Sequence, residues 1–229
     1  MNQVASSLTP AQLAVRVSEI FYSLQGESSR VGLPTVFVRL TGCPLRCTWC
    51  DTEYAFTGGS AQTIEEIVAE TGRYGTRTVC VTGGEPLAQK NCQPLLTALC
   101  DAGFDVSLET SGALDISSVD PRVSRIMDLK APGSGENDKN LWANLEHLRA
   151  SDEIKIVLAD RADYEWARSA ISEHKLGDRC PVLLSPVQGT LPPATLADWI
   201  LADPLPAGRF PIRFQLQLHK MLWGNMRAK

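Results

Sequence analysis

The sequence predicts an α/β fold, an open and partial (β/α) barrel of about six parallel strands. Short apolar runs alternate with amphipathic segments of helical period along most of the 229 residues, and such alternation is typical of a parallel sheet covered by helices. The runs are apolar at nearly every position, as expected for strands that are buried on both faces. Because there are too few strand–helix units for the eight of a closed barrel, we expect the sheet to stay open.

The individual elements follow from local patterns. Runs rich in Val, Ile, Phe and Thr predict strands at 16–24, 34–42, 77–81, 105–109, 123–130, 153–160, 180–187 and in the first part of 212–225. Helical period predicts helices at 63–75, 92–104, 137–150, 162–177 and 196–201. Thr63 followed by Glu66 fits a capping box, and Gly103 and Gly177 are placed to end helices.

Composition indicates an ordinary globular chain. It is 44% hydrophobic and 21% charged, with a formal net charge of −4 and no block of like charge, which argues against a nucleic-acid or membrane-surface partner. There is no apolar run of about 18 residues and no basic start followed by an apolar run, so we expect a cytoplasmic protein. We expect one domain over 1–229, with 1–14 as a flexible N-terminal extension and 226–229 as a C-terminal extension.

Three of the seven cysteines form a compact C-x3-C-x2-C pattern at Cys43, Cys47 and Cys50. A structural zinc site is usually closed by four protein ligands, and an all-cysteine iron–sulfur site also needs four thiolates. The count fits a cubane cluster with one iron left open for a chelating small molecule. The other four cysteines are scattered and are expected to be structural: Cys80, Cys92, Cys100 and Cys180.

The unusual polar residues fall where predicted strands end. Segments rich in Gly, Pro and polar groups follow successive strands at 43–52, 82–86, 109–112, 128–135 and 184–189. Chemistry in parallel α/β folds gathers at the C-terminal ends of strands. These junctions are therefore expected to surround one site.

The C-x3-C-x2-C pattern, with Trp49 before the third cysteine and "GGEP" 33 residues further on, resembles the radical S-adenosylmethionine (SAM) superfamily. The resemblance implies a radical SAM type of partial barrel in which three cysteines hold a [4Fe–4S] cluster. The amino and carboxylate groups of SAM chelate the fourth iron, and reduction cleaves SAM to a 5′-deoxyadenosyl radical.

Within that superfamily the chain resembles the 7-carboxy-7-deazaguanine synthase family of queuosine biosynthesis. "SLQGE" before the cysteine strand and the Asp-Thr pair after the third cysteine carry this likeness, with "VCVTGGEPLAQ", "DLKAPGSG" and "RFQLQLHKMLWGN". The resemblance implies a lyase that converts 6-carboxy-5,6,7,8-tetrahydropterin to 7-carboxy-7-deazaguanine and ammonia, regenerates SAM and is assisted by Mg²⁺. It also implies a homodimer and an electron donor such as flavodoxin or ferredoxin.

The resemblance also assigns residues to roles. Besides the three cysteines, it implies SAM contacts at Trp49, Cys50, Asp51, Gly83, Gly84, Glu85, Asp128, Leu129, Lys130, Ser185, Pro186, Val187 and Gln188. It implies a magnesium ligand in the hydroxyl of Thr52. It implies substrate contacts at Leu24, Gln25, Gly26, Arg39 and Thr82, with Glu109 and His219 as further candidates.

Arg39 lies in the apolar strand "TVFVRL", where a buried guanidinium needs an anionic partner. The substrate carboxylate is one such partner and a salt bridge on the strand face is the other. Two alternatives to the function stay open at this point. One is another radical SAM enzyme, such as a glycyl-radical activase, and the other is a non-catalytic iron–sulfur or zinc module.

Overall fold

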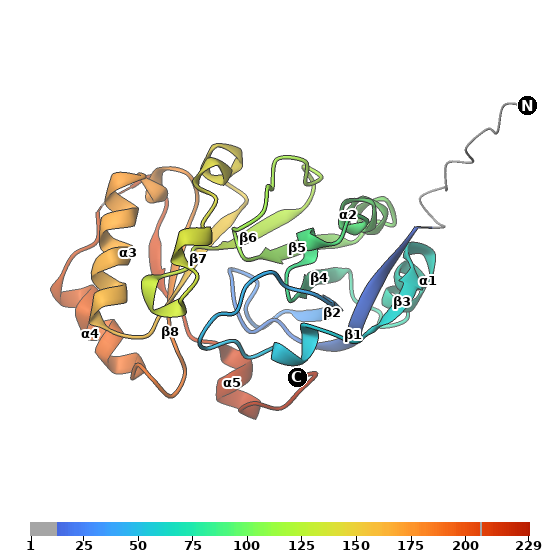
Figure 1. Cartoon of the computed structure of the whole chain (residues 1–229), viewed down its shortest axis with the longest axis horizontal. Helices are drawn as coiled ribbons and strands as arrows, with labels where there is room; N and C mark the ends of the chain where they lie inside the picture. The colour runs from blue at the N-terminus through green and yellow to red at the C-terminus, as the bar shows by residue number, and fades with distance from the viewer. Residues whose placement is uncertain (1–12, 207) are drawn as a thin grey trace, which may run out of the picture.

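A computed structural model describes residues 13–206 and 208–229 and contains a single nine-stranded sheet. The strand order is β3-β1-β2-β4-β5-β6-β7-β8-β9, and the sheet curves without closing (Figure 1). The strands are β1 (Ala14–Leu24), β2 (Pro34–Leu40), β3 (Ser60–Thr63), β4 (Thr78–Gly83), β5 (Asp105–Thr110), β6 (Ser124–Asp128), β7 (Glu153–Leu158), β8 (Val182–Pro186) and β9 (Ile212–Phe214). The predicted open α/β partial barrel is confirmed.

Seven of these strands form the parallel part of the sheet in the described residues. Each neighbouring pair from β2 through β4 to β9 is parallel, against about six expected. β1 runs antiparallel to β2. The short loop 25–33 joins the two strands directly, and short loops connect antiparallel rather than parallel strands. β3, which sequence patterns missed, extends this antiparallel edge.

In the described part of the chain, five α-helices accompany the sheet: α1 (Ile64–Gly72), α2 (Cys92–Asp101), α3 (Arg161–Glu173), α4 (Pro193–Ala202) and α5 (Leu218–Trp223). α1, α2, α3 and α4 agree with the predicted helices. The capping box of α1 is present: the Glu66 N–H donates to Thr63 Oγ1, and the Thr63 N–H donates to Glu66 Oε2.

One predicted helix was wrong, and one predicted strand is short. The segment 137–150 forms two short 3₁₀ helices, η5 (Asn137–Lys139) and η6 (Trp142–His147), not an α-helix. Its asparagines bond to other loops instead: Asn140 pairs with both backbone groups of Lys130, and Asn144 donates to the carbonyl of Leu114. Such side-chain bonding to backbone competes with helix formation. In the segment 212–225 the strand is only three residues long, and the expected tail contains α5.

The core lies between the strands and the helices. β8 is buried at all five positions, and the inner residues of β2, β4 and β7 are equally inaccessible. Cys80, Cys92 and Cys180 are buried free thiols and Cys100 is half-buried.

Residues 1–12 of the predicted N-terminal extension lie outside the described residues, and Ala14 already belongs to β1. No helix in the described parts of the chain is long and apolar enough to cross a membrane.

Candidate active site

The three cysteines lie on the loop that leaves β2 and face one large cavity at the C-terminal ends of the parallel strands. The cavity measures about 990 Å³, and Cys43, Cys47 and Cys50 all line it. Each thiol is free and partly exposed. Gly42 starts the loop with a φ of 99° and donates its N–H to the carbonyl of Ala55, 2.7 Å away. This bond joins the two ends of the cysteine loop.

Backbone bonds to the segment after β6 hold the middle of the loop. The Thr48 N–H donates to the Ser134 carbonyl at 3.0 Å, and its hydroxyl donates to the Gly133 carbonyl at 2.8 Å. The Arg46 N–H donates to Glu136 Oε1 at 2.5 Å. The segment 131–136, most of which belongs to a junction that was expected at the site, therefore supports the cysteines.

The glycine turn after β4 packs directly under the cysteine loop. The Glu85 N–H donates to the Gly42 carbonyl at 2.7 Å. A Cβ on Gly84 would lie 2.3 Å from the Gly42 oxygen and 2.8 Å from the Cβ of Cys43. Only glycine allows this approach, which explains why the "GG" pair follows the strand next to the cysteines.

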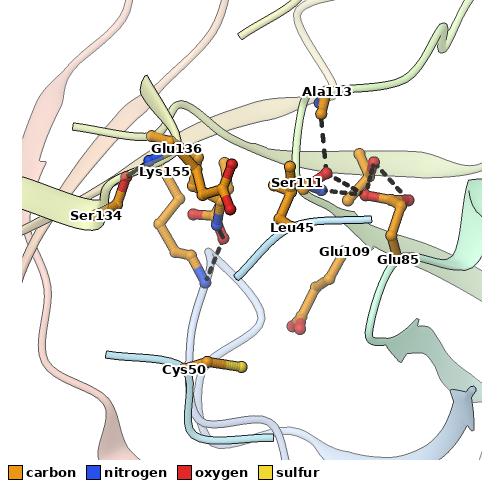
Figure 2. A network of polar contacts seen from close by, with 12 residues as sticks. Leu45, Cys50, Glu85, Glu109, Ser111, Ala113, Ser134, Glu136 and Lys155 are labelled. Atoms are coloured by element: carbon orange, nitrogen blue, oxygen red, sulfur yellow. Dashed lines mark hydrogen bonds and ion pairs between the residues drawn. The ribbon is translucent and has the colours of Figure 1, made fainter. Parts of the chain in front are cut away.

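Glu85 points away from the cavity. Its carboxylate is fully buried and accepts hydrogen bonds from the hydroxyl of Thr110 and from the N–H and hydroxyl of Ser111. Figure 2 shows Glu85 turned toward Ser111, whereas the Glu109 carboxylate is turned toward the side where Cys50 lies. The position of Glu85 suits a role in joining the glycine turn to the end of β5.

The electrostatics of the cysteine loop suit a cationic metal centre. Burial raises the pKa of the Cys43 and Cys47 thiols, and the neighbouring acids and thiols raise it further. A thiol in such surroundings becomes a thiolate when iron compensates its charge. Within 13–206 and 208–229, no three His, Cys, Asp or Glu side chains are grouped to hold one metal ion; in a cubane each cysteine binds a different iron.

An ion-pair network lines the side of the cavity formed by β6 and β7. Lys155 Nζ lies 2.6 Å from Glu27 Oε2 and 3.6 Å from Asp128 Oδ2, and Lys130 Nζ lies 3.0 Å from the same Asp128 oxygen. Burial alone would lower the pKa of Lys155, but Asp128 and Glu27 outweigh it and raise the pKa well above its usual range. Both lysines are therefore charged, and both carboxylates are paired.

Glu27 and Lys155 were missed as site residues by sequence reasoning. A signal was available, since Lys155 interrupts the apolar strand "EIKIVL" in the same way that Arg39 interrupts "TVFVRL". Two buried oxygens near this wall, Asp128 Oδ1 and Ser185 Oγ, have no hydrogen-bond partner among the described residues. Such oxygens fit the polar groups of a bound cofactor.

The "SLQGE" turn also lines the cavity, next to Glu109. Gln25 Nε2 donates to Glu109 Oε1 at 3.2 Å, and the Thr82 hydroxyl donates to Glu109 Oε2 at 3.0 Å. His219 packs so tightly on Gly26 that a Cβ there would lie 2.0 Å from its Nδ1. Burial lowers the pKa of His219, so its imidazole is neutral near pH 7.

Arg39 lines the cavity and also forms the salt bridge that was its alternative interpretation. Its Nε donates to Glu19 Oε1 at 2.8 Å, and both side chains are largely buried, at 14% and 12% exposure. In the described residues its two terminal nitrogens have no hydrogen-bond partner. The free edge of the guanidinium is therefore available to a second anion.

The structure brings most of the predicted site residues together. Those that line the cavity are Leu24, Gln25, Gly26, Arg39, Cys43, Cys47, Trp49, Cys50, Asp51, Thr52, Thr82, Gly83, Gly84, Glu109, Asp128, Lys130, Val187, Gln188 and His219. Glu85, Leu129, Ser185 and Pro186 are buried behind the lining. Further lining residues that sequence reasoning did not single out include Phe21, Phe37 and Tyr54, and the chain from Gly224 to Lys229 also lines the cavity.

A partial barrel with a three-cysteine loop after its first parallel strand and a glycine turn beside it defines the radical SAM class. The model of the radical SAM superfamily matches residues 37–131. The chain is 48% identical to the 7-carboxy-7-deazaguanine synthase of Chlorobaculum tepidum over 91% of its own length and 94% of that protein's. It is 42% identical to the synthase of the same name from Koribacter versatilis, over 91% and 97%.

Structural comparison agrees with the sequence comparison. The crystal structure of QueE from Escherichia coli matches with a TM-score of 0.71 and 25% identity, over 92% of this chain and 96% of that one. The chain therefore belongs to the 7-carboxy-7-deazaguanine synthase family of radical SAM enzymes. Neither a glycyl-radical activase nor a non-catalytic metal module is favoured.

Proposed function

We propose that the protein is a radical SAM lyase that converts 6-carboxy-5,6,7,8-tetrahydropterin to 7-carboxy-7-deazaguanine with release of ammonia, in queuosine biosynthesis. The observation that carries this proposal is the 48% identity to a 7-carboxy-7-deazaguanine synthase over nine-tenths of both chains. The cavity supports it, because its volume is in the range of small-molecule sites. Residues of the cysteine loop and of the "SLQGE" turn line this one cavity, which supports a site shared by cofactor and substrate.

The family implies a [4Fe–4S] cluster and SAM, and the residues present fit both. Cys43, Cys47 and Cys50 would hold the cluster, which supplies the electron that cleaves SAM to a carbon radical. The SAM side of the cavity would be formed by Trp49, Asp51, Gly83, Gly84, Asp128, Lys130, Val187 and Gln188. Glu85, Leu129 and Pro186 would hold the strand ends in place from behind this lining, whereas the unpartnered Ser185 hydroxyl would bond a polar group of SAM.

The substrate would lie between the "SLQGE" turn and Arg39. Glu109 accepts bonds only from neutral donors, Gln25 and Thr82, among the described residues. Its carboxylate suits the adjacent N–H and amino donors of a pterin ring. Leu24, Gly26 and His219 border the same wall, and the stacked rings of Phe21 and Phe37 supply an apolar surface. The free edge of Arg39 would bind the substrate carboxylate as a fork.

Thr52 would bind Mg²⁺. Its hydroxyl lies 3.8 Å from Cys50 Sγ and faces the cavity. Mg²⁺ takes few protein ligands and completes its shell with substrate oxygens and water. A cation at this hydroxyl would therefore clamp an anionic substrate close to the cluster.

Three further properties complete the proposal. The protein would act in the cytoplasm as a homodimer and accept electrons from a small donor such as flavodoxin or ferredoxin. They are supported by family membership. We infer no nucleic-acid or membrane partner, because the chain carries a formal net charge of −4.

The Arg39→Lys variant tests the substrate assignment. Lysine keeps the charge but loses the planar fork. Losing one charge-assisted hydrogen bond costs about 1.5–3 kcal/mol, or about tenfold to a hundredfold in affinity. We expect affinity for the carboxylated pterin to fall by this amount, while SAM binding is unchanged.

The experiment compares wild type and Arg39→Lys against two pterins, with and without the carboxylate, in anaerobically reconstituted protein. The variant should lose affinity only for the carboxylated pterin. Equal loss for both pterins would mean that Arg39 holds the ring or the fold, and the carboxylate role would be given up.

A further inference from the structure

The C-terminal segment of the chain contributes a second arginine to the wall where Arg39 lies. Arg227 Nε donates to Glu19 Oε2 at 2.9 Å, while Arg39 Nε donates to Glu19 Oε1 at 2.8 Å. The Tyr54 hydroxyl also donates to Glu19 Oε1, at 2.9 Å. We call these four residues, Glu19, Arg39, Tyr54 and Arg227, the arginine corner.

Contacts other than the ion pair with Glu19 also hold Arg227 in place. Its guanidinium carbon lies 4.2 Å from the centroid of the Tyr54 ring, a cation–π contact. The next residue, Ala228, packs on the cluster formed by Phe21, Phe37 and Cys80. Arg227 thus lines the cavity with its guanidinium held by Tyr54 and with the following residue packed on the apolar cluster.

The arginine corner carries an excess positive charge. Burial alone would raise the pKa of Glu19, but hydrogen bonds from Tyr54, Arg227 and Arg39 outweigh it and lower the pKa, so the carboxylate is ionised. Burial and the Glu19 contact raise the pKa of Tyr54 to about 12, so the phenol is neutral. Two arginines therefore share one carboxylate, which leaves a net charge of +1.

Three of the other acids that line the cavity are already paired with lysines. Glu27 is paired with Lys155, Asp128 with Lys130, and Asp51 with Lys220 Nζ at 2.7 Å. Glu109 keeps its negative charge, but it accepts from Gln25 and Thr82 and forms no ion pair with Arg39 or Arg227 among the described residues. Without Arg227, Arg39 and Glu19 would form a neutral pair.

We propose that Arg227 is a specificity-determining residue that gives the arginine corner its net positive charge and thereby selects substrates with an anionic group. The inference rests on the proposed function, because it assigns a second cation to the carboxylate expected at Arg39. Arg39 would bind the substrate carboxylate with the planar edge of its guanidinium. Arg227 would share Glu19 with Arg39, so that Glu19 does not fully neutralise the charge of Arg39.

The test uses binding to the reconstituted enzyme rather than turnover. The probes are 6-carboxypterin, a stable oxidised analogue, and pterin without the carboxylate, with dissociation constants measured in wild type, Arg227→Gln, Arg227→Lys and Arg122→Gln. Arg122 is a matched control, since it is an ion-paired arginine of similar exposure, 49% against 55%, that lies outside the cavity lining.

We expect Arg227→Gln to weaken binding of 6-carboxypterin by about fivefold, a modest change because the Arg227 charge is screened by solvent. Binding of pterin should change by less than about twofold, Arg227→Lys should retain most of the affinity, and the selective loss should shrink at high salt. Arg122→Gln should match wild type.

Three outcomes would overturn the inference, and the first two are distinguishable from failure of the proposed function. If wild type prefers 6-carboxypterin but Arg227→Gln leaves that preference unchanged, the charge role of Arg227 is excluded and the proposed function survives. If Arg227→Gln and Arg227→Lys weaken both pterins alike, Arg227 only packs against the cavity wall. If wild type itself does not distinguish the pterins, the carboxylate site and this inference fail together.

Discussion

Gly84→Ala should disable the site while leaving all three cysteines in place. The new Cβ would lie 2.3 Å from the Gly42 oxygen, and real Cβ atoms essentially never come closer than 3.0 Å to another heavy atom. The cysteine loop must therefore retreat by about 0.7 Å, and overpacking of this kind costs about 1–3 kcal/mol. A displacement on the order of 1 Å at a reacting centre can cost about 10²-fold in rate.

The assay is iron content after reconstitution, the Michaelis constant for SAM, and thermal unfolding of the same preparation. We expect lower iron retention, a raised Michaelis constant for SAM and a melting temperature reduced by about 2–10 °C. Gly72→Ala is the matched control, because no atom outside its helix lies within 4 Å of the new Cβ. That variant should be unchanged or slightly more stable. Wild-type iron content and kinetics in Gly84→Ala would refute the close packing of the glycine turn on the cysteine loop.

Three further outcomes are expected. Cys47→Ala should abolish iron loading, whereas Cys92→Ala should load normally because Cys92 is buried away from the cavity; full iron content in Cys47→Ala would remove the cluster assignment. Thr52→Ala should weaken the response of turnover to added Mg²⁺, and an identical titration curve in both proteins would exclude Thr52 as a ligand. Burial alone would raise the pKa of Glu27, but Lys155 and Gln217 lower it from 4.5 to about 2. The ion pair therefore adds stability above about pH 4.5 that is lost as the pH falls toward 2, and Glu27→Gln should flatten the acid limb of an unfolding-versus-pH profile. A Glu27→Gln profile that still parallels wild type would contradict the ionised pair.

The parts of the site whose residues lie close together in the sequence could be predicted from the sequence. The cysteine loop and the glycine turn are each contiguous, and both follow strands whose apolar pattern is unambiguous. Since neighbouring parallel strands end at the same edge of a sheet, their meeting follows from the fold class. The open barrel was also predictable, because the same apolar patterns mark its strands.

The parts that depend on tertiary contacts could not be predicted. The local sequence does not show that Thr110 and Ser111 bond the carboxylate of Glu85, one of the residues implied to contact SAM. The asparagines of 137–150 satisfy distant backbone groups, so a helical pattern there was misleading. Nothing in the local sequence around Arg227 indicates that it pairs with Glu19, more than 200 residues earlier.

The balance of SAM during turnover tests the central claim most directly. Reconstituted enzyme would be given a strong reductant, Mg²⁺, the carboxytetrahydropterin and a known, limiting amount of SAM, and both 7-carboxy-7-deazaguanine and remaining SAM would be quantified by mass spectrometry. The account predicts many equivalents of product for each SAM lost, with ammonia released in equal amount to product and no product from Cys47→Ala. Stoichiometric cleavage of SAM to 5′-deoxyadenosine without 7-carboxy-7-deazaguanine would contradict it and would point to another radical SAM reaction.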